Sequence, residues 1–271
     1  MALFSWYNNT MVLLCTSLFF ILGLIIGSFL NVVIYRYQTS KNLGGRSACM
    51  SCRSSLTWYE LIPVFSFIFL GGRCKSCRTH ISLQYPLVEI ITGILFFSLF
   101  LKFQDVFFSS PYEFAGLFIF YVLAFILLLI IATYDLRHKI IPDQLSFIFG
   151  LLTFVGLFLF KNFEFYPHMP TVLEFFSGPM LALPFASLWL ISRGTWMGLG
   201  DAKLAIGLGW LSGLAVALSG VVIAFWAGAI IGIILLLTRS HFGMKSEIPF
   251  APFLVFGAYV AFILELHLFP I

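Results

Sequence analysis

Residues 113–143 read EFAGLFIFYVLAFILLLIIATYDLRHKIIPD. After Glu113, the segment carries no charge until Asp135, which is a run of about the 20 apolar residues that a membrane-spanning helix needs. The segment therefore predicts a transmembrane helix that ends at an aspartate. Acidic residues are scarce in this chain, 11 in 271, so an aspartate at a membrane boundary calls for a reason.

The same apolar character extends over most of the chain. Hydrophobic residues make up 61% and charged residues 10%, with a mean hydropathy of +1.05, and this balance excludes a soluble globular domain. We expect an all-α polytopic membrane protein with about eight transmembrane helices. Between the sixth and seventh, Ser219-Gly220 is the one visible break. The expected spans are 11–34, 84–101, 113–134, 144–161, 173–192, 202–218, 219–238 and 250–268.

Lys and Arg residues predict the orientation of these spans. No basic residue precedes the first span and no small-residue cleavage site follows it, so it is not expected to be a cleaved signal peptide. The positive-inside rule then puts the N-terminus outside, with only Lys102 and Lys161 on outer segments. The net charge of +4 thus reflects topology and gives no hint of nucleic acid. The basic residues expected inside are Arg36, Lys41, Arg46, Arg53, Arg73, Lys75, Arg78, Arg137, Lys139, Arg193, Lys203, Arg239 and Lys245.

Residues 36–83 form the one long polar insertion, and they hold four of the five cysteines. These are paired as Cys49-Met50-Ser51-Cys52 and Cys74-Lys75-Ser76-Cys77. Two Cys-x-x-Cys turns separated by about 20 residues are typical of a tetrahedral zinc site with four thiolate ligands. We expect a structural zinc ion bound by these cysteines and no disulfides, because a cytoplasmic loop is kept reduced.

Two aspartates are candidates for catalysis. Asp135 ends an apolar helix and has the basic neighbours Arg137 and Lys139; Asp201 follows Gly198-Leu199-Gly200 and opens another helix. Each has a structural alternative, an ion pair for the first and an N-cap for the second. Both nevertheless fall on the predicted cytoplasmic side, where two carboxylates sharing a proton can activate water.

Three further residues have supporting roles in this interpretation. Asp143 follows Pro142, which is a common way to begin a helix, so a catalytic or substrate-orienting role is the weaker alternative for it. Gly198 and Gly200 let a backbone pass close to another segment, which we expect to be the substrate.

The chain resembles the type IV prepilin peptidases, also called leader peptidase/N-methyltransferases, nearly from end to end. Beside the cysteine pairs and the aspartate motifs, the resemblance rests on four ordered segments. They are Gly27-Ser28-Phe29-Leu30-Asn31-Val32-Val33-Ile34-Tyr35-Arg36, Glu60-Leu61-Ile62-Pro63, Gly71-Gly72-Arg73-Cys74 and Tyr85-Pro86-Leu87-Val88-Glu89.

This resemblance implies a bacterial inner-membrane enzyme with catalytic Asp135 and Asp201. Its substrates would be pilin or pseudopilin precursors, cut at the cytoplasmic face after a short basic leader. The new N-terminal residue would then be methylated with S-adenosylmethionine, for which Glu60, Gly72 and Arg73 are candidate binding residues by their position in the motifs. The implied domains are a first transmembrane helix (1–35), a cytoplasmic zinc loop (36–83) and a membrane peptidase domain (84–271).

Two other classes of protein remain open. One is a different intramembrane aspartic protease without methyltransferase activity, for which the cysteine loop would be unnecessary. The other is a non-enzymatic scaffold or transporter with a zinc knuckle, and a transporter is expected to show internal repeats or helices broken at the midplane.

Overall fold

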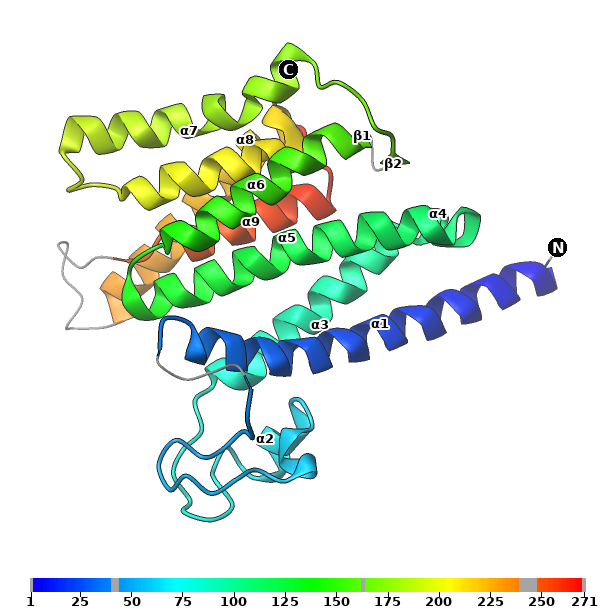
Figure 1. The fold of residues 1–271 in the computed structure, drawn as a ribbon, viewed down its shortest axis with the longest axis vertical. Helices are drawn as coiled ribbons and strands as arrows, with labels where there is room; N and C mark the ends of the chain where they lie inside the picture. Colours follow the sequence, from blue (N-terminus) through cyan, green and yellow to red (C-terminus); the bar gives the residue numbers. More distant parts are fainter. Residues whose placement is uncertain (1, 40–43, 162–163, 239–247, 270–271) are drawn as a thin grey trace. The chain divides into compact units, whose positions relative to one another are not determined.

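The computed structural model describes residues 2–39, 44–161, 164–238 and 248–269, so Lys41, Arg239 and Lys245 lie outside the described residues. The regular secondary structure of the described residues is helical apart from a minimal hairpin of β1 (Phe160–Lys161) and β2 (Glu164–Phe165) (Figure 1). The helices are α1 (Ala2–Arg36), the 3₁₀ helix η1 (Trp58–Leu61), α2 (Phe65–Phe69), α3 (Gln84–Lys102), α4 (Gln104–Ser109), α5 (Pro111–His138), α6 (Asp143–Leu159), α7 (Val172–Ser192), α8 (Leu199–Thr238) and α9 (Ala251–Ile263).

The chain divides into two compact units, Met1–Ser109 and Ser110–Ile271. In the first unit, α1 packs along α3, and the polar lobe with η1 and α2 connects them. Small residues on α1 allow the close approach: a Cβ added to Gly23 would lie 2.6 Å from the carbonyl oxygen of Thr92. The Gly27 position is similarly tight against Glu89. Spacing of small residues on a membrane helix is typical of such packing.

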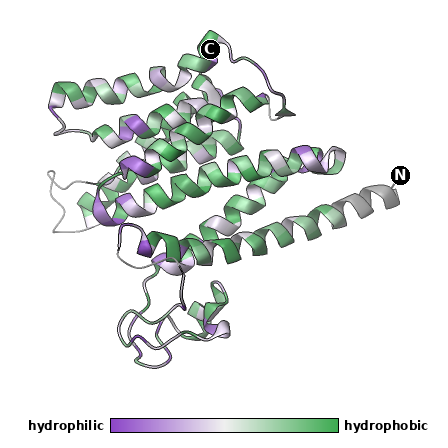
Figure 2. Cartoon of the chain, viewed as in Figure 1, coloured by the Kyte–Doolittle hydropathy of each residue, from purple (hydrophilic) through white to green (hydrophobic). Residues whose placement is uncertain are grey.

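In the second unit, α8 packs against α6, α7 and α9, while α5 packs against α6 and α9 (Figure 1). Figure 2 shows that most of the length of these helices is coloured as hydrophobic. Backbone contact between α7 and α8 is direct, since a Cβ added to Gly209 would lie 2.7 Å from the Cα of Gly178.

Five described helices are long and apolar enough to cross a membrane: Thr10–Arg36, Gln84–Lys102, Pro111–His138, Val172–Ser192 and Leu199–Thr238. The expected spans 144–161 and 250–268 appear as shorter apolar helices, α6 and α9. The expectation of about eight full-length spans is therefore confirmed only in part, because neither of these two helices reaches 18 residues.

The expected break at Ser219-Gly220 is wrong, because α8 is interrupted at Gly213 instead. This residue has φ 74° and ψ 164°, a backbone conformation that residues other than glycine rarely adopt. Figure 1 shows the consequence: the yellow first part of α8 runs in one direction and the orange second part returns. Ser219 instead lies within the returning helix, where its hydroxyl donates to the carbonyl of Ala215.

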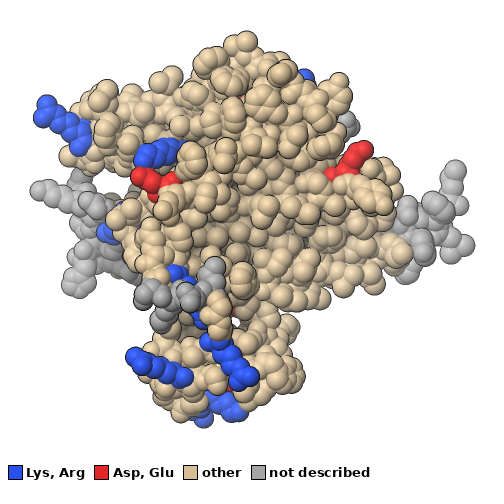
Figure 3. Space-filling model, in the orientation of Figure 1, with Lys and Arg blue, Asp and Glu red and all other residues tan. Residues whose placement is uncertain are grey.

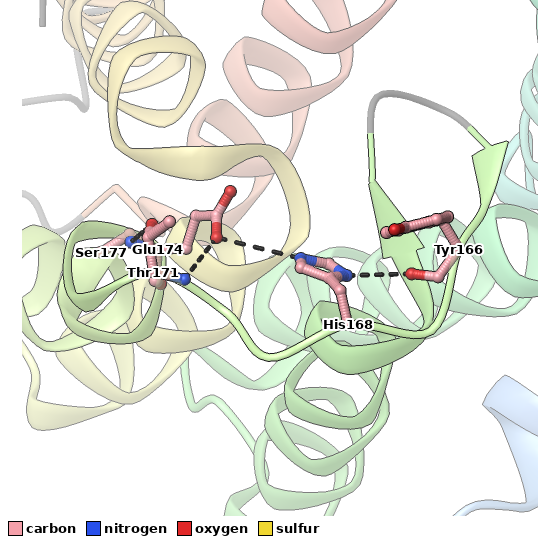
Figure 4. A network of polar contacts seen from close by, with 5 residues as sticks. All are labelled: Tyr166, His168, Thr171, Glu174 and Ser177. Carbon is pink, nitrogen blue, oxygen red and sulfur yellow. Dashed lines mark hydrogen bonds and ion pairs between the residues drawn. The ribbon is translucent and has the colours of Figure 1, made fainter.

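A polar network caps the start of α7 (Figure 4). The Thr171 hydroxyl accepts a hydrogen bond from the Glu174 amide, and the Glu174 carboxylate accepts one from the Thr171 amide, as in a capping box. His168 lies between this carboxylate, 3.9 Å away, and the Tyr166 carbonyl. These contacts order the segment between the β1–β2 hairpin and α7.

Candidate active site and metal centre

Asp135 lies in the last turn of α5 and is buried, with 4% of its surface exposed. Its Oδ2 accepts a hydrogen bond of 3.2 Å from the backbone N–H of Ala251, the first residue of α9. The free amides at a helix N-terminus carry partial positive charge. The start of α9 thus provides a hydrogen-bond donor for the Asp135 carboxylate. The macrodipole of α5 by itself disfavours a negative charge at this end of the helix.

Asp201 is the third residue of α8 and is 7% exposed. Its carboxylate accepts a hydrogen bond from the backbone of Gly198, the residue that precedes the helix. Asp201 therefore lies within the first turn of the helix and not at the N-cap position. Its Oδ1 is buried and has no hydrogen-bond partner among the described residues. One carboxylate oxygen of the site is free to accept a hydrogen bond from a bound molecule.

The two aspartates are near one another although 66 positions separate them in the sequence. They come from α5 and α8, and the charge on Asp135 acts through space on Asp201. Two buried carboxylates in this relationship compete for a proton, so one of them can hold it while the other is ionised.

Gly200 brings the start of α8 against the loop that follows α5. A Cβ added to Gly200 would lie 2.8 Å from the Cβ of Ile141, which is too close for any side chain. The space where a Cβ of Gly200 would lie is therefore filled by the protein's own loop. A Cβ on Gly198 would meet only an ordinary contact, 3.7 Å from Oδ2 of Asp201.

Asp143 begins α6, as the Pro-Asp pattern predicts, and it pairs with a lysine on α8. Lys203 Nζ lies 2.7 Å from Asp143 Oδ1, and the Asp143 side chain is 75% exposed. This pair connects the first turn of α6 with the second turn of α8. Its exposure separates Asp143 from the two buried carboxylates.

The four cysteines of the polar lobe come together. Their Sγ atoms all lie within 4.8 Å of one another, and those of Cys49 and Cys77 are 3.7 Å apart. Sulfur atoms on a tetrahedral zinc ion, at about 2.3 Å from the metal, are roughly 3.8 Å apart. The donor set and its spacing fit a closed four-thiolate site, so the cluster can hold a metal ion.

The two Cys-x-x-Cys turns have the same local structure. In each, the first cysteine's amide donates to a carbonyl five residues on, and an arginine four residues on, Arg53 or Arg78, has a positive φ of 59°. A hydroxyl contacts the second sulfur of each turn, Ser54 at 3.1 Å from Cys52 and Thr79 at 3.2 Å from Cys77. The Thr79 hydroxyl lowers the pKa of Cys77 to about 6, which favours the thiolate that a metal requires.

The residues expected to bind S-adenosylmethionine have mixed surroundings. The Glu60 carboxylate accepts hydrogen bonds from the amide and hydroxyl of Thr57, which hold its pKa below the usual range. Gly72 has φ 67°, and a Cβ there would lie 3.0 Å from the Phe67 ring. Local structure therefore explains why position 60 is a glutamate and position 72 is a glycine. Arg73 is exposed beside the second cysteine turn.

Sequence reasoning missed two contributors to the aspartate site. Ala251 contributes only a backbone amide, for which no side-chain motif exists. Ile141 is an apolar residue in a loop and offers no signal by itself. Pro252, the second residue of α9, is the one local feature that marks a helix start here.

The fold and the site together define a multi-pass membrane protein with two interacting buried aspartates, as expected of a membrane aspartic peptidase. Residues 21–103 match the model of the bacterial peptidase A24 N-terminal domain, and residues 122–237 match that of the type IV leader peptidase family.

Several curated relatives, each named prepilin leader peptidase/N-methyltransferase, resemble the chain over most of its length. The Bacillus subtilis (strain 168) protein is 30% identical over 254 residues, which cover 91% of this chain and 93% of that protein. The Myxococcus xanthus (strain DK1622) protein is 32% identical over 84% of this chain and 65% of its own length. The Neisseria gonorrhoeae protein is 27% identical over 88% of both chains. No solved structure matches the chain. The chain belongs to the type IV leader peptidase family.

Proposed function

We propose that this protein removes the leader from type IV pilin or pseudopilin precursors, with Asp135 and Asp201 as the catalytic pair. The observation that carries the assignment is a pair of buried carboxylates, from α5 and α8, in which the charge of Asp135 acts on Asp201 and Oδ1 of Asp201 has no hydrogen-bond partner. The names of the relatives support the class of substrate.

In the proposed reaction, the ionised carboxylate takes a proton from a water molecule, which attacks the carbonyl carbon of the scissile amide. The protonated carboxylate then donates its proton to the leaving nitrogen, and the C–N bond breaks. The unpartnered Asp201 Oδ1 is a suitable acceptor for the water. The hydrogen bond from Ala251 holds the Asp135 carboxylate in a defined orientation.

We propose an orientation with the N-terminus outside and both the aspartates and the cysteine lobe at the cytoplasmic face. Counting the two parts of α8 separately and including α6 and α9 makes eight crossings in all. Alternation then puts the end of α5 and the start of α8 on the same side, which supports a shared site. The basic residues follow the positive-inside rule in this arrangement. Residues 84–271 would form the peptidase domain.

The N-methyltransferase named in the relatives is the second proposed activity, with S-adenosylmethionine as methyl donor and the zinc-bound cysteine lobe (36–83) as the associated region. The new N-terminal amine would accept the methyl group and lose a proton. Zinc would hold the lobe together through Cys49, Cys52, Cys74 and Cys77. Glu60 and Gly72 are already engaged in local structure and do not define a site for the donor.

The proposed peptidase is tested by assaying purified protein in detergent with a precursor peptide that spans the leader junction. Asp135→Asn and Asp201→Asn are each expected to lower cleavage by about a thousandfold or more, as for members of a catalytic unit. Asp143→Asn serves as the matched control because it removes an exposed carboxylate from the same region. Near-normal cleavage by either buried variant would overturn the pairing.

A further inference from the structure

The cysteine lobe carries an apolar face that points away from its interior. On α2, Phe65, Ile68 and Phe69 are exposed, the last at 84%. On η1, Trp58 is 78% exposed and Tyr59 lies beside it. We call these five residues the aromatic face. It contrasts with the usual pattern of a polar lobe, where large apolar side chains lie inward.

The spacing on α2 shows that this exposure is systematic. Positions 65, 68 and 69 are related by three and four residues, so they share one side of the helix. Phe67, on another side, contacts the interior of the lobe at Gly72. The helix thus uses its less apolar side for packing in the lobe and leaves its more apolar side uncovered by the described residues of this unit.

A hydrogen bond fixes the start of α2 to a membrane-spanning helix. The backbone N–H of Val64 donates to Oε2 of Glu89 at 2.7 Å, and Glu89 is buried. Glu89 is the sixth residue of α3, so it lies roughly 8 Å along the helix from the first residue. Val64 has φ 62°, a rare conformation for a β-branched residue, which persists only where surrounding contacts hold it.

This bond sets the level of α2 relative to the bilayer. Because α3 is a candidate span from Gln84 onward, its second turn lies near the boundary between headgroups and acyl chains. Val64, the residue before α2, therefore lies near this boundary. The start of α2 thus lies beside the membrane-spanning part of the same unit.

The charge of the lobe is complementary to an anionic membrane. Between residues 44 and 83 there are five Lys and Arg residues and one acidic residue, Glu60. Figure 3 shows Lys and Arg side chains gathered on this lobe. Lys75 also donates a hydrogen bond of 2.6 Å to the Tyr59 hydroxyl, which brings a cation to the edge of the aromatic face. Trp, Tyr and Phe flanked by basic residues are typical of segments that lie in the membrane interface.

We propose that the aromatic face inserts into the interface of the leaflet in which α1 ends and α3 begins, with the surrounding basic residues on anionic lipid headgroups. A second copy of the chain is a poorer occupant, since stable dimers bury about 20–30 residues a side. The insertion holds the four-cysteine cluster at the membrane surface. It depends on neither proposed activity.

The test uses the full chain in lipid nanodiscs of phosphatidylethanolamine and phosphatidylglycerol. Phe69 is replaced by an environment-sensitive fluorescent amino acid through nonsense suppression, which leaves the cysteines unmodified. Met50 is the matched control because it is apolar, 67% exposed and in the same lobe but outside the aromatic face. Lipids spin-labelled near the headgroup are expected to quench the probe at position 69 severalfold more than the probe at position 50.

Hydrogen exchange of the unmodified chain gives a second measurement. Both the unmodified chain and a variant with serine at positions 65, 68 and 69 are placed in these nanodiscs. The backbone amides of residues 58–69 should exchange more slowly in the unmodified chain than in the variant. Equal quenching at the two probe positions would overturn the proposal. Quenching or protection that requires two chains per disc would also overturn it, because a second copy would then cover the face.

Discussion

The backbone amide of Ala251 donates a hydrogen bond of 3.2 Å to Oδ2 of Asp135, across 116 positions of sequence. Ala251 is fully buried, and its amide is one of the first-turn donors that α9 itself cannot satisfy. The contact connects the end of α5 with the start of α9. It makes α9 part of the support for the aspartate site, even though the helix contributes no acidic side chain there.

Replacing the Ala251 amide by an ester, through incorporation of lactic acid, removes the N–H and adds no atom. We expect kcat/KM to fall roughly 10- to 100-fold, because a hydrogen bond to a charged group is worth about 1.5–3 kcal/mol. The same ester exchange at Phe253, whose amide donates to the Phe250 carbonyl in the same turn, is the control. Equal losses at both positions would show that helix stability, and not the Asp135 contact, accounts for the effect.

Gly200→Ala is expected to separate the start of α8 from the loop at Ile141. The added Cβ would lie 2.8 Å from the Ile141 Cβ, and displacement of a catalytic group by about 1 Å can cost 100-fold in rate. Cleavage assays on purified protein measure the loss. Adding Ile141→Gly, which removes the Cβ that the new methyl group meets, should restore part of the activity. Gly150→Ala, where nothing lies within 4 Å of the added Cβ, should leave cleavage unchanged. Normal cleavage by Gly200→Ala alone would mean that this close approach is dispensable.

Asp143→Asn should change the free energy of unfolding by no more than about 1 kcal/mol and retain substantial cleavage, because exposed ion pairs contribute little. The Asp143 and Lys203 side chains are 75% and 41% exposed. Lys203→Met, which removes the other partner, should behave alike. Thermal unfolding together with cleavage kinetics tests both variants. Complete loss of cleavage in well-folded Asp143→Asn would identify Asp143 as a member of the catalytic pair.

Metal analysis of purified, reduced protein should find about one zinc per chain, as in closed four-thiolate sites. Serine in place of Cys49, Cys52, Cys74 or Cys77 should remove the metal and speed proteolysis of the lobe, since metal binding and local folding are coupled. Zinc affinity should fall as the pH is lowered, because protons compete for the thiolates. Cys15→Ser, a cysteine outside the cluster, is the control.

The same cysteine variants should impair methylation more than cleavage, because the aspartates lie on α5 and α8 in the other compact unit. Cleavage and methylation of one precursor peptide, followed by mass spectrometry, measure both activities in a single reaction. Parallel loss of the two would show that the lobe organises the whole enzyme.

Much of the molecule could be predicted from local patterns in the sequence. Apolar runs of suitable length identify membrane helices because the backbone of a span must satisfy its hydrogen bonds internally. The two Cys-x-x-Cys motifs predict that the four sulfur atoms cluster, since each turn brings two of them close together. The Pro-Asp pattern predicts the start of α6 at Asp143. The ordered motifs indicate the family, which the family models and the relatives confirm.

Other features depend on contacts between distant segments, and only the tertiary structure decides them. The donor for Asp135 is a backbone amide of α9, which carries no sequence signal. Ile141 packs against Gly200 so closely that no Cβ fits there, and the break in α8 lies at Gly213, where the chain reverses. Local sequence specifies where most of these helices form. Which helix ends meet is decided by packing, because such contacts join residues that no local pattern relates.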